Sequence, residues 1–385
     1  MDYFLTEEQK EIRDLARRIA REKVLPVRAE LDESEEFPWP VMKSLAEADL
    51  FGVYLPEEYG GIGGGCFELC LAVEELSRAC GGVAVTYAAS ALGAFPILLF
   101  GNGQQKEKYL PQIAAGKKLA AFALTEANAG SDAGGIQTAA RPDKDEYILN
   151  GTKQWITNGG ESEIYTVIAM TDKSKGSRGA SAFIVEKGTP GFEFGKKEKK
   201  MGIRASTTRE LVFTDCRVPK ENLLGREGMG FMLAMRTLDT SRPGIGAQAV
   251  GIAQGALDEA IDYARERVQF GKPISSFQAI QHMLADMATQ VEAARALTYA
   301  AARYIDSGAK DVSKISAMAK VFASDVAMQV TTQAVQILGG YGYMRDYPIE
   351  KMMRDAKITQ IYEGTNQIQR NVIALQLIKE KAQGK

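Results

Sequence analysis

The chain has a single histidine, His282, among 385 residues. That count excludes most zinc hydrolase sites and any Ser-His-Asp triad that would need a second histidine. His282 lies in a helical pattern, where a structural role is expected. Four cysteines, Cys66, Cys70, Cys80 and Cys216, are too few for a disulfide framework in so long a chain. Cys66 and Cys70 have the spacing to face a metal from one helix, but no partner pair follows, so no metal site is predicted.

Charge gives the chain no electrostatic reason to bind nucleic acid or an anionic membrane. Lysine and arginine number 47 against 49 acidic residues, which leaves a net charge of −2. The basic run at 196–200 is short and broken by Glu198, which is typical of a solvated loop or strand end. We expect no uncharged apolar run to reach the roughly 18 residues of a membrane-spanning helix. Residues 1–5 lack a basic stretch and an apolar core, so we expect a soluble protein of a reducing intracellular compartment.

Length and composition indicate an ordinary globular protein of two or three domains. A chain of 385 residues exceeds what one hydrophobic core usually holds, and 45% of the residues are hydrophobic. Residues 1–121 are predicted to form a helical domain. Thr6–Gln9 has the form of a capping box with Leu5 in the staple position, and another helix is predicted over Glu68–Cys80.

The hydrophobic period changes near residue 122, and residues 122–230 are predicted to form an all-β domain. The runs 147–149 and 154–156 flank Asn150-Gly151, which predicts a hairpin with a tight turn. Further strands are predicted at 165–170, 182–185 and 210–213.

Residues 231–385 return to a helical period. Residues 238–243 indicate the start of a first long helix, and further helices are predicted around 280–294, 315–330 and 358–378. Gly339-Gly340 marks the end of the third helix. The predicted fold class is therefore α with a central β domain: an N-terminal helical domain, a middle β-barrel or sandwich, and a C-terminal four-helix bundle.

The stretch Ile361–Gln367 contains the strongest candidate for a catalytic residue. One carboxylate, Glu363, stands between an aromatic ring and Gly364 in a segment with no other charge. A poorly hydrated carboxylate has a raised pKa and can act as a general base near neutral pH, and glycine allows a ligand to approach closely. The same stretch also fits a helix start capped by Thr365.

Two segments at the start of the β region have the chemistry to hold a polar or planar ligand. The run 122–132 offers backbone N–H groups and hydroxyls to a pyrophosphate or a flavin edge, although an ordinary Ser/Gly turn has the same composition. Trp155 and Thr157 share one face of a predicted strand and can meet one planar ligand. The alternative is a core tryptophan beside a turn.

Two further motifs have the composition of phosphate-binding sites. Gly244–Ala249 fits the dinucleotide fingerprint G-x-G-x-x-A, but no strand precedes it, so we reject a nicotinamide site. Arg265–Pro273, followed by Gln278, joins two predicted helices. Its arginines are suited to bidentate phosphate binding, and a solvated interhelical loop is the alternative.

Four motifs in combination resemble the acyl-CoA dehydrogenases, FAD flavoproteins of fatty-acid and amino-acid oxidation, in particular the bacterial short- and medium-chain branch. They are Asp239–Arg242, Arg267–Gly271, Gln336–Gly340 and Ile361–Thr365, in the order and spacing of that family. The resemblance covers essentially the whole chain and implies the acyl-CoA dehydrogenase fold. It also implies an FAD site shared between subunits, and hence a homotetramer.

The resemblance implies roles at the substrate. Glu363 would remove the α-proton of an acyl thioester, its amide N–H would donate to the thioester carbonyl, and Gly364 would lie against the substrate. Asp239 and Arg242 would contact the pantetheine part of CoA, and Arg242 would also orient Glu363. Ser131 would lie near the pantetheine arm as well as the flavin.

The implied FAD contacts fall into three groups. The flavin loop and the following strand would supply Phe122, Leu124, Thr125, Gly130, Ser131, Trp155 and Thr157, with Thr157 close to flavin N5. A neighbouring subunit would hold the adenosine side through Arg267, Phe270, Gln278, Gln336, Gly339 and Gly340. Thr365 and Gln367 would complete the flavin contacts.

The chain departs from the family pattern at Ala127, where proline is common, without losing a side-chain contact. Ser241 stands where some subfamilies carry their base, which favours Glu363 in that role. Ala91 argues against a subgroup that forms cyclic dienes. The acyl pocket is expected around Tyr87, Ala88, Ser90 and Leu92.

We therefore expect an enzyme that oxidises a short- or medium-chain acyl-CoA to the trans-2-enoyl-CoA and passes electrons to electron-transfer flavoprotein. It would act in a bacterial cytoplasm, or in the mitochondrial matrix if the chain is a mature form. The alternatives are a dehydrogenase or enoyl reductase for a cyclic, branched or aryl-propionyl CoA thioester, an oxygen-using thioester oxidase, and a catalytically silent acyl-CoA-binding or assembly subunit.

Overall fold

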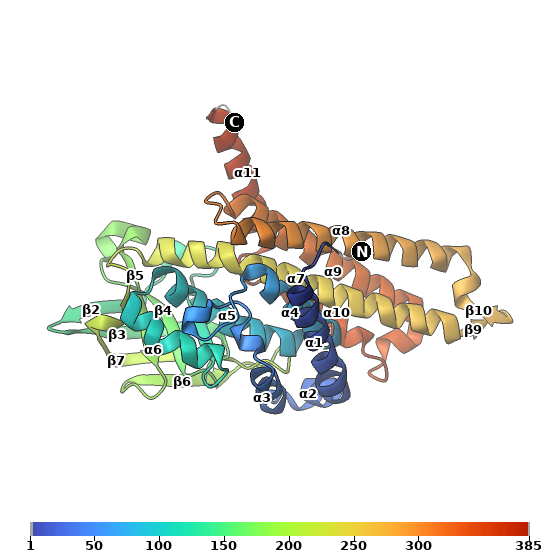
Figure 1. Ribbon diagram of the computed structural model, residues 1–385, viewed down its shortest axis with the longest axis horizontal. Coiled ribbons are helices and arrows are strands. Elements are labelled where there is room, and N and C mark those ends of the chain that lie inside the picture. The colour runs from blue at the N-terminus through green and yellow to red at the C-terminus, as the bar shows by residue number, and fades with distance from the viewer. Residues whose placement is uncertain (1–2, 384–385) are drawn as a thin grey trace.

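The computed structural model describes residues 3–383, and the outermost residues of the first and last predicted domains lie outside that range. Helices come first, a sheet follows, and long helices complete the chain (Figure 1). The N-terminal helices are α1 (Glu7–Ile19), α2 (Arg28–Ser34), α3 (Trp39–Glu47), α4 (Cys66–Ala79), α5 (Gly81–Phe100) and α6 (Gly103–Ala114).

Helix α1 begins at the predicted capping box. The Thr6 hydroxyl accepts from the Gln9 amide at 3.2 Å, and the Gln9 side chain accepts from the Thr6 amide at 3.1 Å. Two N–H groups that the first turn leaves without partners are thereby satisfied. Ile12 and Ile19 on the inner face are buried.

The middle region is one eight-stranded sheet, in which β1 pairs with β4 beside the path β6-β7-β3-β2-β4-β5-β8. Among the described residues the path starts at β6 and ends at β8 without closing, so the prediction of a barrel is wrong. The strands are β1 (Ala120–Ala123), β2 (Ala139–Asp143), β3 (Glu146–Thr157), β4 (Ile164–Met170), β5 (Ala180–Glu186), β6 (Phe192–Lys197), β7 (Thr208–Pro219) and β8 (Leu223–Leu224).

The predicted hairpin at Asn150-Gly151 is wrong, because β3 runs straight through these residues. Gly151 lies at a register shift against β7 and has φ +145°. A side chain there would place its Cβ 2.6 Å from Thr138 Oγ1, so glycine is needed for close approach rather than for a turn. The tight turn lies earlier, where Asp143 pairs with Glu146.

Strand β4 shows how the sheet is fixed against the helices. Ile164 and Ile168 pack into the core shared with the N-terminal helices, whereas Tyr165 and Val167 pack into a separate core on the other face. This alternation is the period-2 pattern of a strand covered on both sides.

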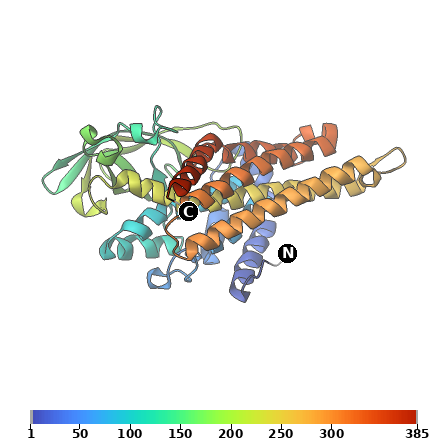
Figure 2. The same cartoon turned by 90° about the horizontal axis from the view of Figure 1, so that it is seen from above.

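The C-terminal helices are α7 (Gly230–Glu266), α8 (Gln278–Asp306), α9 (Ser313–Leu338), α10 (Ile349–Thr359) and α11 (Asn366–Ala382), with a short hairpin of β9 (Val268–Gln269) and β10 (Lys272–Pro273) after α7 (Figure 2). Helix α9 ends at Leu338, and Gly339 is its C-cap, as predicted. The helix predicted over 358–378 is wrong as one piece, because α10 ends at Thr359 and α11 starts at Asn366.

The prediction that residues 238–243 begin a helix is wrong, because they lie inside α7. Proline lacks an N–H, so Pro243 leaves the carbonyl of Asp239, four residues earlier, without its helical donor. The hydroxyl of Ser316 on α9 donates to that carbonyl at 2.6 Å. A contact from another helix therefore allows α7 to continue, and the fingerprint at Gly244–Ala249 lies within a helix.

The prediction that no uncharged apolar run reaches membrane-spanning length is also wrong. Helix α5 has 20 residues without a charged side chain and passes a length and hydropathy test for a membrane span. Of its most apolar window, 72% is buried inside the protein. A buried core helix passes the same test, and α5 packs against α4, α7 and β1.

Candidate functional site

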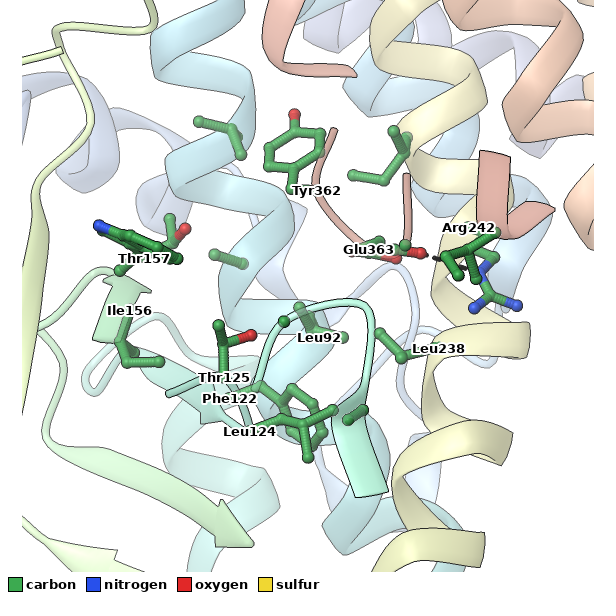
Figure 3. Close-up of a pocket in the computed structure, with 18 of the residues that line it drawn as sticks. Leu92, Phe122, Leu124, Thr125, Ile156, Thr157, Leu238, Arg242, Tyr362 and Glu363 are labelled. Carbon is green, nitrogen blue, oxygen red and sulfur yellow. Dashed lines mark hydrogen bonds between the residues drawn. The ribbon is translucent and has the colours of Figure 1, made fainter. Parts of the chain in front are cut away.

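A cavity of about 200 Å³ lies where α5, the sheet, α7 and the α10–α11 loop meet (Figure 3). Ten of the predicted site residues line it: Phe122, Leu124, Thr125, Gly130, Ser131, Trp155, Thr157, Arg242, Glu363 and Gly364. The outermost of them, Phe122 and Gly364, are 242 positions apart in the sequence, and the fold brings them to one cavity.

Glu363 faces this cavity from the loop between α10 and α11. The Ser241 hydroxyl on α7 donates to its Oε2 at 2.6 Å. Burial raises the pKa of Glu363, while the Ser241 hydrogen bond and the charges of Arg242 and Lys320 act in the opposite direction. The result is a carboxyl group with a pKa above its ordinary value, which suits a general base that works near neutral pH.

The backbone around Glu363 is held in an unusual conformation by side chains from three helices. Glu363 has φ +51° and Gly364 has φ +92°. The Glu363 carbonyl accepts from Arg242 Nε and Gln369 Nε2, each at 3.1 Å. The Gly364 carbonyl accepts from Gln369 Nε2 at 3.0 Å and from Lys320 Nζ at 2.8 Å. Strain of this kind persists only where surrounding contacts hold it.

The amide N–H of Glu363 remains available to a ligand. Within residues 3–383 it has no acceptor, whereas the preceding amide, that of Tyr362, donates to Ile358 O at 3.1 Å. A donor next to the carboxylate is thus free to bind an oxygen atom in the cavity.

Arg242 is fixed by a buried ion pair. Its Nη1 donates to Asp239 Oδ1 at 2.7 Å, and the other oxygen of Asp239 accepts from Ser313. Asp239 does not line the cavity, so the structure gives it the role of holding Arg242. Its predicted direct contact with a substrate stays a prediction.

The opposite wall is the loop after β1, and Glu126 organises it. One Glu126 oxygen accepts from Lys153 Nζ at 2.7 Å and from the Thr138 amide, and the other accepts from the Gln137 amide at 2.6 Å. Burial lowers the pKa of Lys153 to about 8, although the Glu126 charge acts the other way. Lys153 also donates to Leu124 O at 2.9 Å, so the pair ties the loop to β3.

Trp155 and Thr157 project from β3 into the cavity, as predicted. The pairing of β3 with β7 shifts between Lys153 and Ile156, and at this bulge Trp155 has φ +58°. Its side chain is 55% exposed, so the alternative of a core tryptophan is wrong. A bulge that turns an aromatic ring toward a cavity is a common device beside functional sites.

The donors and acceptors on this wall fit a planar, polar cofactor. In the described part of the chain the hydroxyls of Thr125, Ser131 and Thr157 make no hydrogen bond, and a Cβ added to Gly130 would meet nothing within 4 Å. An exposed aromatic plane, three free hydroxyls and an open glycine match what a flavin ring and its pyrophosphate require.

One face of α5 forms the apolar end of the cavity. Val85, Ala88, Ala89 and Leu92 line it, at the spacing of a single helix face. The predicted pocket residues Tyr87 and Ser90 point elsewhere, which corrects that prediction. The Tyr87 hydroxyl donates to Leu50 O at 2.6 Å, and the Ser90 hydroxyl accepts from the Ala120 amide at 3.2 Å.

Six of the remaining predicted cofactor contacts lie far from this cavity in the same chain. Arg242 and Glu266 are separated by 24 residues of α7, which corresponds to about 36 Å. Beyond Glu266, Phe270 is 93% exposed and Arg267 lies over the Tyr341 ring at 5.4 Å. This second group comprises Arg267, Phe270, Gln278, Gln336, Gly339 and Gly340. Thr365 caps α11 and Gln367 is exposed, and neither lines the cavity.

Several residues of the site were not predicted from the sequence. Tyr362, Met235, Leu238, Ile245 and Ile368 supply apolar walls. The sequence marks Ser241 only as a position that lacks a base, yet its hydroxyl contacts the Glu363 carboxylate. Lys320 looked like an ordinary helix residue, and only an apolar stretch around it signals burial. Among residues 3–383, no cluster of three or more histidine, cysteine or acidic side chains has the geometry to hold a metal ion.

Comparison with known proteins agrees with this geometry. Three family models match consecutive parts of the chain: the acyl-CoA dehydrogenase N-terminal domain at 6–117, the middle domain at 121–216 and the C-terminal domain at 228–378. The curated relatives include "Acyl-CoA dehydrogenase, short-chain specific" of Megasphaera elsdenii, 52% identical over 96% of this chain and 97% of that protein. They also include "Acryloyl-CoA reductase (NADH)" of Anaerotignum propionicum, 51% identical over 98% of this chain and 96% of that protein.

Solved structures match equally closely. Butyryl-CoA dehydrogenase from Megasphaera elsdenii superposes with a TM-score of 0.96 at 51% identity, covering 98% of this chain and 100% of the other. A chain from the structure "Electron transferring flavoprotein of Acidaminococcus fermentans: Towards a mechanism of flavin-based electron bifurcation" gives 0.96 at 54%, covering 98% and 99%. An acyl-CoA dehydrogenase complexed with FAD from Bacillus anthracis gives 0.93 at 39%, covering 99% and 68%.

Proposed function

The chain belongs to the acyl-CoA dehydrogenase family and is a flavin-dependent oxidoreductase, and we propose that it oxidises a short-chain acyl-CoA, of about four carbons, to the trans-2-enoyl-CoA. The observation that carries the proposal is Glu363, which faces a cavity whose opposite wall carries Trp155 and Thr157. The short chain is supported by the relatives and the solved structure that carry short-chain and butyryl-CoA names.

FAD is the cofactor that these residues fit. Thr125, Ser131, Trp155 and Thr157 would hold the isoalloxazine and the pyrophosphate, and when bound FAD accepts a hydride from the substrate. The second group of predicted contacts, around Arg267, lies too far away to serve the same FAD within one protomer. We therefore propose that it binds the adenosine end of a partner's FAD in a homotetramer. The exposed apolar side chains of α11, among them Leu375 and Ile378 at 67% each, support a buried interface there.

Glu363 would take the α-proton of the thioester. Such a proton is far too weakly acidic for a free carboxylate, so the negative charge that develops on the carbonyl oxygen must be stabilised. The Glu363 amide N–H is placed to donate to that oxygen, and a donor of this kind contributes roughly 3–4 kcal/mol to the transition state. The acyl chain against Leu92 and Ala88 would expel water and raise the pKa of Glu363 further.

Electrons would leave for an electron-transferring flavoprotein, because a chain 54% identical to this one belongs to a structure described by that name. The relatives named above come from bacteria, and we propose a cytoplasmic location. The reverse direction is the second candidate. A relative at 51% identity is called an acryloyl-CoA reductase, and a carboxyl group with a raised pKa is equally able to return a proton to the α-carbon.

The test is anaerobic mixing of the flavin-loaded protein with a series of CoA thioesters. Butyryl-CoA should bleach the oxidised flavin, and bleaching by cyclic or aryl-propionyl thioesters alone would overturn the proposed substrate. Glu363→Gln should keep the yellow flavin while bleaching slows by about 10²–10⁴-fold. Glu193→Gln, an exposed acid on β6, is the matched control. Unchanged bleaching in Glu363→Gln would remove Glu363 from the mechanism.

A further inference from the structure

The loop that carries Glu363 is hydrogen-bonded to a buried lysine. Lys320 lies in the middle of α9 with 0% of its surface exposed. Its Nζ donates to the Gly364 carbonyl and to Asn366 Oδ1, both at 2.8 Å. These acceptors are the residue after the base and the first residue of α11, so one side chain links α9 to the C-terminal half of the turn that presents the carboxylate.

Lys320 has no carboxylate within ion-pair distance in the part of the chain that the structure describes. Asp325, the acid nearest along α9, is engaged by Arg370 at 2.6 Å and by Gln360 at 2.7 Å. The other charged neighbours of Lys320 are Glu363 from the loop and Arg242 from α7. Arg242 is itself paired with Asp239. The ammonium group is therefore buried against neutral acceptors, with Glu363 as a negative charge that is close but not bonded to it.

A buried charge without a partner costs stability, and a methionine would fill the same volume at no such cost. Two carbonyls in left-handed backbone need donors, and Gln369 already supplies one to each. The hydrogen bond alone does not require a charged side chain at this position. A lysine at this position adds a positive charge close to Glu363, the proposed base.

We propose that Lys320 is a positioning residue for the proposed dehydrogenation: its ammonium group holds the Glu363 turn through the Gly364 carbonyl and favours the ionised form of Glu363 once substrate excludes water. The inference rests on the proposed function, in which Glu363 takes a proton. It concerns a side chain that touches neither substrate nor flavin.

The charge on Lys320 is itself sensitive to pH. Burial lowers the pKa of Lys320 to about 7, while the charge of Glu363 raises it and that of Arg242 lowers it further. As pH rises through about 7 the ammonium form is lost. The support for the turn then weakens on the alkaline side, which gives wild-type enzyme a decline above pH 7 that is separate from the titration of Glu363.

The test compares four variants by the pH dependence of flavin bleaching with butyryl-CoA. Lys320→Met removes the charge and the donor, Lys320→Gln keeps a donor, and Lys320→Arg keeps the charge. Lys314→Met is the control, since Lys314 lies on the same helix and pairs with Glu380 on α11 at 2.5 Å. An opposite charge nearby lowers a carboxyl pKa. Lys320→Met and Lys320→Gln should therefore each move the acid limb of the rate–pH profile, where the rate rises as Glu363 ionises, to higher pH by about one unit. Lys320→Arg should leave the acid limb in place and abolish the decline above pH 7.

If the acid limbs of the rate–pH profiles of Lys320→Met and Lys320→Gln coincide with that of the wild type, the inference is overturned. Failure of wild-type protein to bleach with any thioester would instead overturn the proposed function. If the variants do not retain flavin, hydrogen exchange of residues 358–368 decides the matter. Faster exchange in Lys320→Met than in Lys314→Met supports the inference, and equal exchange overturns it.

Discussion

Replacing Ser241 by alanine should raise the pKa of Glu363. The Ser241 hydroxyl lies 2.6 Å from Oε2, a short charge-assisted distance, and it favours the ionised carboxylate. Hydrogen bonds to charged groups contribute about 1.5–3 kcal/mol, and we use the lower end because the charges of Arg242 and Lys320 still favour the ionised carboxylate without the hydroxyl. At 1.36 kcal/mol per unit, the loss corresponds to a rise of about one pH unit.

The assay is the rate of anaerobic flavin bleaching by butyryl-CoA from pH 5 to pH 9. The base works in its ionised form, so the rate rises with pH through the pKa of Glu363, and a higher pKa moves that limb to higher pH. Ser241→Thr keeps a hydroxyl and should restore the wild-type limb. Thr240→Val removes a neighbouring hydroxyl that donates to Arg236 O and should change nothing. A Ser241→Ala profile that overlies the wild type would refute the reasoning.

Two other substitutions test the walls of the cavity. Gly364→Ala should lower the bleaching rate at least tenfold with flavin retained, because its Cβ would lie 2.5 Å from Gln369 Nε2 at φ +92°; an unchanged rate would show that the turn tolerates a side chain. Glu126→Gln should destabilise the fold by about 3–5 kcal/mol in urea unfolding, because it leaves the Lys153 ammonium buried without a counter-charge. Glu193→Gln should not, and equal midpoints for the two variants would contradict a structural role for the Glu126 pair.

Some helix boundaries were predictable because they follow from local rules. The capping box at Thr6–Gln9 and the end of α9 at Gly339 depend on residues within one turn of each other. The cavity residues were found because their chemistry is unusual for their surroundings, as for Trp155 on a strand and Glu363 in an uncharged stretch. Resemblance to a known family then joined motifs that no local rule connects.

The errors come from contacts between distant segments. Asn150-Gly151 reads as a turn, but glycine is needed there because Thr138 approaches its backbone. Pro243 reads as a helix start, but Ser316 on another helix supplies the missing donor. Sequence periodicity shows neither contact, because both depend on how separate elements pack.

The break between α10 and α11 has the same origin. Thr365 fits the start of a helix, but the turn before it depends on side chains from α7, α9 and α11 that hold the Glu363 and Gly364 carbonyls. Ser241 and Lys320 were missed for this reason too. Each has an ordinary sequence context on its own helix, and its contact with the Glu363–Gly364 turn forms only once three helices meet.

Helix α5 carries a consequence for how the protein is made. Until α4, α7 and β1 cover it, the newly synthesised chain presents 20 uncharged residues, as apolar as a segment that a lipid bilayer would accept. Transiently exposed surface of this kind promotes aggregation. Variants that delay the docking of its neighbours should therefore be recovered in inclusion bodies or in the membrane fraction. Such substitutions will lower the yield of soluble protein rather than its specific activity.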